Sequence, residues 1–288
     1  MNLNKLAKKY NSDKYGSHYY TPIYQRYMEK KKNDKINIFE IGVGGLEPKV
    51  GYSGLTTGGE SLQMWRDFFK KGSVVGLDII KKKLKFGNRV KIFHGSQSDP
   101  IILNKIIKKY KKFDFIIDDG SHRYKDVRYS FEHLFPYLKN GGYYFIEDTQ
   151  SSYIRELGGD GANLDNQKTV INYFKKIIDK LNYKEIENPY YQPGFFDKNI
   201  TEVHFYHNLI VIKKDNNLEE SNIFPSVPAL RKILLIPIII DENKKDLLVF
   251  YKNKFYDEWN LNIEKNELIN YLLPTEDLED VNTIKNKY

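Results

Sequence analysis

The sequence of 288 residues contains no cysteine. This absence excludes disulfide bonds, thiolate metal sites and cysteine nucleophiles, so a metal would need nitrogen or oxygen ligands, which favours a hard cation. Long apolar runs are also lacking, because the most apolar stretch, 233 to 240, is interrupted by Pro237 and is far shorter than the roughly 20 residues of a membrane helix. The first residues lack the apolar core of a signal peptide. We therefore expect a soluble cytoplasmic protein with no membrane partner.

The composition predicts a globular protein with a weak positive charge. Apolar residues make up 40% of the chain and aromatic residues 15%, which is enough for a sizeable core. Lys and Arg number 46 against 38 Asp and Glu, a net charge of +8. The lysines are spread along helix-like stretches such as 105 to 112, as on a solvated face, so we expect no nucleic-acid partner. A small anionic substrate would explain the surplus equally well.

Short apolar runs alternate with longer amphipathic ones, which is typical of βα units around a parallel sheet. The predicted strands are 37–41, 74–78, 90–94, 113–118 and 142–147, and the predicted helices are 61–71, 100–110, 124–138 and 167–181. Pro100 directly follows Asp99, which suits the first turn of a capped helix. Asn140-Gly141-Gly142 is interpreted as the stop of the helix before the fifth strand.

Two further apolar runs meet at His207-Asn208, within residues 202–213. So short a link permits only an antiparallel hairpin, because a parallel pair needs a long crossover. The fold class is therefore α/β: a doubly wound, mostly parallel, seven-stranded sheet that ends in an antiparallel hairpin. We divide the chain into an N-terminal lid segment (1–30), the sheet domain (31–214) and a C-terminal appendage (215–288) for substrate or oligomer contacts.

Glycines follow the first predicted strand, in Glu40-Ile-Gly42-Val-Gly44-Gly45. Such glycines let the backbone approach a nucleotide closely, but Glu47 stands where a dinucleotide fingerprint has its third glycine, so a nicotinamide cofactor is disfavoured. The second strand ends at Asp78, whose carboxylate is placed to accept hydrogen bonds from ribose hydroxyls. Together these features favour an adenosine-containing ligand; a tight turn with a capping acid is the alternative.

Acidic pairs end the fourth and fifth strands, as Asp118-Asp119-Gly-Ser-His122 and Glu147-Asp148-Thr. Because adjacent parallel strands end at one crevice, Asp119, Glu147 and Asp148 are expected to converge, and such a cluster requires a cation: Mg²⁺, Mn²⁺ or Ca²⁺. His122 would lie at its rim as a candidate general base. The alternative is that an aspartate caps the next helix and Glu147 pairs with a lysine.

The order of these motifs resembles the class I S-adenosylmethionine methyltransferases. More narrowly, the chain resembles the metal-dependent sugar O-methyltransferases of the mycinamicin deoxysugar type, with the cephalosporin hydroxylase-like methyltransferases as relatives. The segments that carry the resemblance are 12–22, Glu-x-Gly-x-Gly from Glu40, 58–62, Asp78, 95–99, Ile-Asp-Asp-Gly-Ser-His and Phe-Ile-Glu-Asp-Thr. It covers residues 10 to 213 and does not reach the appendage.

The resemblance implies two sets of site residues. The residues implied for the methyl donor are Glu40, Gly42, Gly44, Ser61, Asp78, Gln97 and Asp118. For magnesium it implies Asp119, Glu147 and Asp148, with His122 as general base and Asp119 beside it in catalysis. Sequence alone leaves open whether Asp118 or Asp119 faces the ion.

The resulting hypothesis is a Mg²⁺- and S-adenosylmethionine-dependent O-methyltransferase. Its expected acceptor is a hydroxyl of a sugar that is nucleotide-linked or part of a surface glycan or a glycosylated metabolite, as in capsule or natural-product biosynthesis. A catechol-type methyltransferase and a basic protein that modifies or binds RNA are the alternatives. A homo-oligomer is left open.

Overall fold

The structure is a computed structural model that describes residues 1–45, 57–186 and 191–221. The described residues fall into two compact units: those within 1–183 and 193–218, and those within 184–192 and 219–221. Of the second unit, 184–186, 191–192 and 219–221 are described; there Lys184 pairs with Glu220 at 2.6 Å and Ser221 Oγ donates to Glu185 at 2.7 Å. Most of the predicted appendage (215–288) therefore lies outside the described residues, and the proposed domain boundaries stay predictions.

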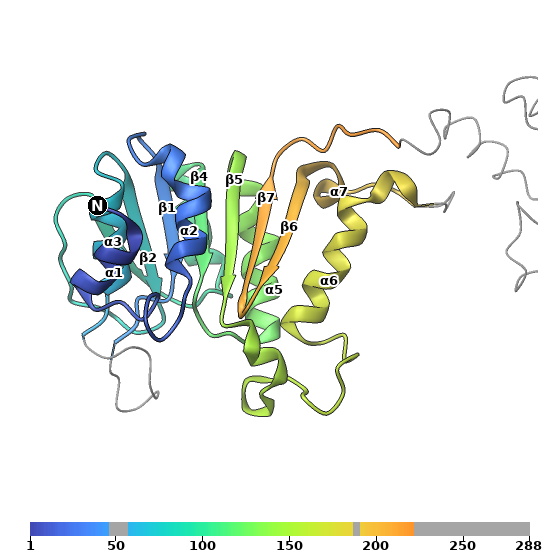
Figure 1. Ribbon diagram of the computed structural model, residues 1–288, viewed down its shortest axis with the longest axis horizontal. Helices are drawn as coiled ribbons and strands as arrows, with labels where there is room; N and C mark the ends of the chain where they lie inside the picture. The colour runs from blue at the N-terminus through green and yellow to red at the C-terminus, as the bar shows by residue number, and fades with distance from the viewer. Residues whose placement is uncertain (46–56, 187–190, 222–288) are drawn as a thin grey trace, which may run out of the picture. The chain divides into compact units, whose positions relative to one another are not determined.

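The first unit contains one seven-stranded sheet in the order β3-β2-β1-β4-β5-β7-β6 (Figure 1). The strands are β1 (Asn37–Ile41), β2 (Ser73–Asp78), β3 (Val90–His94), β4 (Phe113–Asp118), β5 (Leu138–Glu147), β6 (Ile200–Tyr206) and β7 (Leu209–Lys214). The pairs among β1 to β5 are parallel, whereas β7 pairs antiparallel with both β5 and β6. The predicted fold class, including the terminal hairpin, is confirmed.

Helices cover both faces of this sheet (Figure 1). They are α1 (Leu3–Tyr10), α2 (Thr21–Met28), α3 (Glu60–Phe68), α4 (Pro100–Tyr110), α5 (Tyr124–Leu134), α6 (Val170–Leu181) and α7 (Phe195–Asn199), with short 3-10 turns η1 (Glu29–Lys31), η2 (Phe135–Tyr137), η3 (Thr149–Tyr153), η4 (Arg155–Leu157) and η5 (Tyr183–Glu185). None of the helices within the described ranges is long and apolar enough to cross a membrane.

Alternate strand residues build two cores, one on each face. Ile116 and Ile146 pack with α4, α5 and α6, whereas Phe115, Ile117 and Phe145 pack with α1, α2 and α3. This follows from strand geometry, because successive side chains point to opposite faces. Parallel strands buried on both faces are continuously apolar, which explains why β4 is buried at every position.

Two local expectations can be compared directly with the structure. The carboxylate of Asp99 caps α4 by accepting from the Ile101 amide at 2.8 Å, with Pro100 in the first turn, as predicted. The predicted helix stop at 140–142 is wrong: α5 ends at Leu134, η2 follows around Pro136, and the glycines lie inside β5. Pro136 has no amide hydrogen with which to continue the helical hydrogen bonds, and Leu138 already pairs with Phe113 of β4.

The N-terminal residues belong to the first unit and contribute to its core. Leu3, Leu6, Tyr24 and Met28 are all buried in the core to which α3 also contributes. Between α1 and α2, the segment 11–20, which we call the N-terminal turn, is held by backbone hydrogen bonds such as His18 N–H to the Asp13 carbonyl at 2.9 Å. The role of this region as a lid stays a prediction.

Candidate active site

The glycine turn after β1 lies directly against the loop after β4. Gly42 has φ of +90°, and a Cβ on it would fall 1.8 Å from the carbonyl oxygen of Asp119. The Asp119 amide in turn donates to the Ile41 carbonyl at 3.0 Å. Gly44 also has positive φ, and its carbonyl oxygen would lie 2.1 Å from a Cβ at Gly58. Glycine is required here both for its backbone conformation and for the close approach of the two loops.

Replacing Gly42 with alanine is expected to lower the free energy of unfolding by roughly 2–6 kcal/mol, because backbone strain and a backbone clash add together. Gly87→Ala is the matched control: Gly87 has a similar φ of +86°, with nothing within 4 Å of an added Cβ. Strain alone should then cost about 1 kcal/mol. Urea unfolding of both variants measures the difference. Equal losses would show that the contact with the Asp119 loop is unimportant.

Asp78, at the end of β2, fastens the glycine turn. Its carboxylate accepts from the Val43 amide at 2.9 Å and from the Ile80 amide at 2.7 Å. The side chain is largely buried, and Lys82 lies 3.8 Å away. The structure therefore places Asp78 beside Gly42 and Gly44, as the predicted donor site requires.

Glu40 and Ser61 are brought together, although they are far apart in sequence. Ser61 Oγ donates to Glu40 Oε2 at 2.8 Å, and Trp65 Nε1 donates to the same oxygen at 3.1 Å. Complete burial raises the pKa of Glu40 to about 7, although the nearby Lys14 ammonium acts in the opposite direction. The charged form of this side chain thus depends on the cation beside it.

The two adjacent acids after β4 face different surroundings. Asp118 is buried in the interior, where it accepts from Gln97 Nε2 at 3.0 Å and from the hydroxyls of Ser130 and Tyr144. Burial raises the pKa of Asp118 to about 6. Gln97 in turn accepts from the Ser121 amide at 2.7 Å, which fixes the loop that carries His122. Asp118 and Gln97 therefore support this loop from behind.

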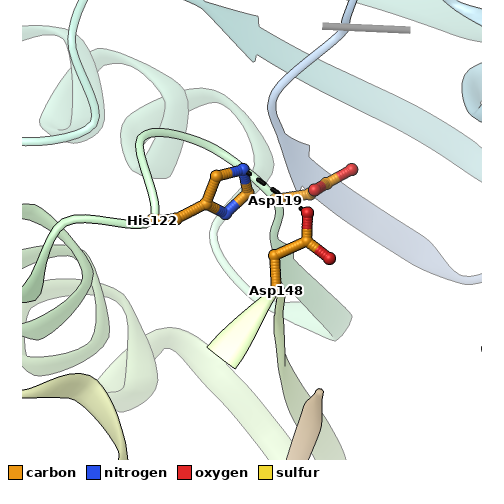
Figure 2. A group of neighbouring side chains, drawn as sticks. All are labelled: Asp119, His122 and Asp148. Carbon is orange, nitrogen blue, oxygen red and sulfur yellow. Dashed lines mark ion pairs between the residues drawn. The ribbon is translucent and has the colours of Figure 1, made fainter. Parts of the chain in front are cut away.

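Asp119 instead joins His122 and Asp148 in a cluster at the ends of β4 and β5 (Figure 2). One ligand atom from each residue lies within 4.8 Å of the others, and His122 Nε2 is 3.8 Å from Asp148 Oδ2. Both His122 and Asp148 have left-handed backbone, with φ of 56° and 53°. Such strain in non-glycine residues is concentrated at functional sites, because the surrounding structure must hold it.

A second cluster shares Asp119 and contains Glu40 and Glu147. The Lys14 ammonium lies among these three acids: Nζ is 2.6 Å from Asp119, 2.7 Å from Glu147 and 3.3 Å from Glu40. Burial and the neighbouring Asp119 charge raise the pKa of Glu147 well above its usual range. The three predicted metal ligands are thus divided between two clusters. Asp148 belongs to the first, Glu147 to the second and Asp119 to both.

The N-terminal segment was expected to close over the site as a lid, but sequence reasoning missed that the N-terminal turn places Lys14 among the acids themselves. Besides Lys14, Tyr20 donates its hydroxyl to Asp148 Oδ1 at 2.7 Å, and His18 Nε2 lies 3.9 Å from the same oxygen. Burial raises the pKa of Asp148, but the His122 charge and the Tyr20 hydrogen bond outweigh it, so this pKa lies below its usual value. The available signal was the motif within 12–22, whose polar residues show no helical or strand period.

The chain is similar to sugar O-methyltransferases of known sequence and structure. It is 38% identical over 219 residues to demethylmacrocin O-methyltransferase of Streptomyces fradiae, covering 75% of this chain and 54% of the relative. It is 37% identical over 219 residues to mycinamicin VI 2''-O-methyltransferase of Micromonospora griseorubida, covering 75% and 53%. The chain thus spans about half the length of the curated relatives it matches. No family model matches the chain.

Solved structures show the same similarity to sugar O-methyltransferases. The MycE methyltransferase of the mycinamycin pathway, in complex with Mg and S-adenosylhomocysteine, superposes with a TM-score of 0.70 at 36% identity, covering 76% of this chain and 56% of that one. Its complex that also holds mycinamycin VI gives a TM-score of 0.69, with 76% and 55% covered. Over the residues that align, the chain is a homologue of the sugar O-methyltransferases and has the class I methyltransferase fold.

Proposed function

We propose that this protein is an S-adenosylmethionine- and Mg²⁺-dependent O-methyltransferase that acts on a sugar hydroxyl. The observation that carries the proposal is the convergence of the glycine turn, Asp78 and the Asp119–His122–Asp148 cluster at the carboxyl ends of adjacent strands. In open α/β sheets, ligands bind at the carboxyl ends of the strands. The relatives bear the names of enzymes that methylate glycosylated macrolides and tetracenomycins, so we propose a glycosylated metabolite as the acceptor.

We propose that the methyl donor binds along the glycine turn. The proposed contact residues are Glu40, Gly42, Gly44, Ser61 and Asp78; Gln97 and Asp118, which the resemblance places in the same set, are buried and bonded to other side chains, so we propose an indirect role for them. The fit rests on the position of the turn at the carboxyl end of β1, where the Asp78 carboxylate fixes it through the Val43 amide at 2.9 Å. Within this set, Gly42, Gly44 and Asp78 line the turn itself. Because Asp118 and Gln97 bond to each other behind the His122 loop, we propose that they act by holding that loop.

For the metal we propose Asp119, Glu147 and Asp148 as ligands. They offer oxygen donors only, which suits Mg²⁺, and Asp119 lies with Asp148 on one side and with Glu147 on the other. Bound Mg²⁺ would supply Lewis acidity that lowers the pKa of a coordinated sugar hydroxyl. The chain's own part would be to orient the sugar so that one of two neighbouring hydroxyls lies in line with the donor's methyl group.

We propose that His122 takes the proton in this reaction. As the acceptor oxygen bonds to the methyl carbon, the bond from carbon to sulfur breaks and its electron pair stays on sulfur, giving S-adenosylhomocysteine. A ring nitrogen of His122 receives the hydroxyl proton. His122 Nδ1 is buried without a hydrogen-bond partner among the described residues, and Nε2 lies near Asp148, whose negative charge would stabilise the imidazolium that forms.

The test is methyl transfer from labelled S-adenosylmethionine to three acceptors: a glycosylated macrolide with free neighbouring hydroxyls, a catechol and total RNA. We expect label on the macrolide sugar that depends on added Mg²⁺ and changes little with monovalent salt. Preferential labelling of the catechol would support the small-molecule alternative. Labelling of RNA that falls steeply with ionic strength would support the nucleic-acid alternative.

Other partner assignments are also proposals. A nucleotide-linked sugar stays a candidate acceptor, and the assay can include one beside the macrolide. Cytoplasmic location and assembly into a homo-oligomer stay predictions from the sequence.

A further inference from the structure

Lys14 is a buried cation within the group of acids at the carboxyl ends of the strands. Its side chain is 1% exposed, and its ammonium contacts three carboxylates, from Glu40, Asp119 and Glu147. These acids lie at or just after the ends of β1, β4 and β5, whereas Lys14 comes from the N-terminal turn. A buried charge is costly unless it is paired, so this arrangement requires a strong compensating interaction.

The N-terminal turn holds Lys14 in this position. Its carbonyl oxygen accepts from the amides of Tyr20 and Thr21 at 3.1 and 3.2 Å. Tyr20 is itself buried and donates to Asp148. These contacts fix the backbone from which the Lys14 side chain reaches the acids.

One ammonium, that of Lys14, faces three carboxylates. Burial alone would lower the pKa of Lys14, but the charges of Asp119, Glu147 and Glu40 together raise it well above its usual value. Three neighbouring carboxylates repel one another, of which Glu40 and Glu147 are buried and Asp119 is partly exposed, and Lys14 is the cation that contacts all three among the described residues. Without it, the group would be left with uncompensated negative charge.

Lys14 uses one oxygen each of Asp119 and Glu147. It contacts Asp119 Oδ2 and Glu147 Oε1, and the hydroxyl of Tyr24 also donates to Glu147 Oε1. The side-chain hydrogen bonds recorded for these two acids among the described residues do not involve Asp119 Oδ1 or Glu147 Oε2. Each carboxylate can thus pair with the ammonium and still offer an oxygen to a second cation.

We infer that Lys14 is a positioning residue. Its ammonium occupies the buried side of the carboxylate cluster and offsets the repulsion between Asp119 and Glu147. A single divalent cation then binds on the other side of the cluster, beside Asp148 and His122. The identity of that cation rests on the proposed function. In this arrangement the N-terminal turn and the cation site form together, because one side chain joins them.

The first test needs no metal. In EDTA, we expect Lys14→Met to lower the unfolding temperature by roughly 10 °C, because one partner of a buried ion-pair group is removed. Adding Glu147→Gln to it should recover part of this loss, since a charge that has become uncompensated is removed as well. Lys14→Arg should lose less than Lys14→Met. The control Lys9→Met removes an exposed lysine of α1 and should change little.

Several outcomes of this test would overturn the inference. One is a double variant no more stable than Lys14→Met alone, which would show that Lys14 is not a counter-ion to Glu147. Another is a Lys14→Arg variant as unstable as Lys14→Met. If Lys14→Met does not fold, the double variant should fold; failure of both would also overturn the inference.

The second test adds Mg²⁺ without methyl donor or acceptor. We expect calorimetry to find one Mg²⁺ per wild-type chain and a second in Lys14→Met, with a larger rise in unfolding temperature for the variant, because the divalent ion replaces the ammonium. A purely structural lysine would leave the Mg²⁺ dependence unchanged, and that result would overturn the inference. If the wild type binds no Mg²⁺, the proposed metal fails, while the measurements in EDTA still decide the role of Lys14.

Discussion

Replacing His122 with alanine is expected to lower kcat for methyl transfer by about 10²- to 10⁴-fold. The reason is that the reacting hydroxyl would lose its proton acceptor, while the groups proposed to bind the donor lie on other loops. His122 occupies a strained position beside Asp119 and Asp148, so its ring is held in the cluster by the surrounding structure. Affinity for S-adenosylhomocysteine should stay within about twofold, because the glycine turn and Asp78 are untouched.

The matched control is His133→Ala, a change at a histidine of α5 whose ring bonds to Asn104 outside the site. Steady-state kinetics and calorimetric titration with S-adenosylhomocysteine separate the two effects. If His122→Ala changed donor affinity alone, His122 would belong to the donor site. If both histidine variants lost the same activity, the loss would not be due to a general base.

Removing the metal, or the charge of Asp119, is expected to abolish most of the activity. Excess EDTA should stop turnover and Mg²⁺ should restore it, whereas Asp119→Asn should lose roughly 100-fold or more in kcat even with Mg²⁺. Asp119 is the acid common to both clusters, so its loss weakens the cation site on either side. Turnover that continues in excess EDTA would rule out the proposed metal.

Stability distinguishes a functional Asp119 from a structural one. Burial and the neighbouring Asp148 charge raise the pKa of Asp119, against the attraction of Lys14, so its charged form is held at a net cost. In EDTA, Asp119→Asn should therefore unfold at the same temperature as the wild type or higher. The control Asp34→Asn changes an exposed aspartate and should alter neither activity nor stability. A marked fall in unfolding temperature for Asp119→Asn would assign it a structural role.

The pattern of apolar residues determined most of the fold. The predicted strands at 37–41, 90–94 and 113–118 and the helix at 100–110 match the structure end to end. These segments are predictable because burial on one or both faces imposes a period on the residues themselves. The short link at His207-Asn208 determined the hairpin in the same local way. The helix stop was misplaced because the pairing of Leu138 with β4 is not a local property.

Sequence also predicted that the acids at the ends of β4 and β5 would lie close together, because the carboxyl ends of neighbouring parallel strands lie at the same end of the sheet. It could not decide between Asp118 and Asp119, since adjacent residues at a strand end point to opposite sides. Only the packing of Gln97, Ser130 and Tyr144 around Asp118 shows which of the two lies in the interior. Nor could it show that Lys14, 105 positions before Asp119, completes the group. Periodicity reports burial in a core, whereas a buried charge is decided by partners that chain folding brings from distant segments.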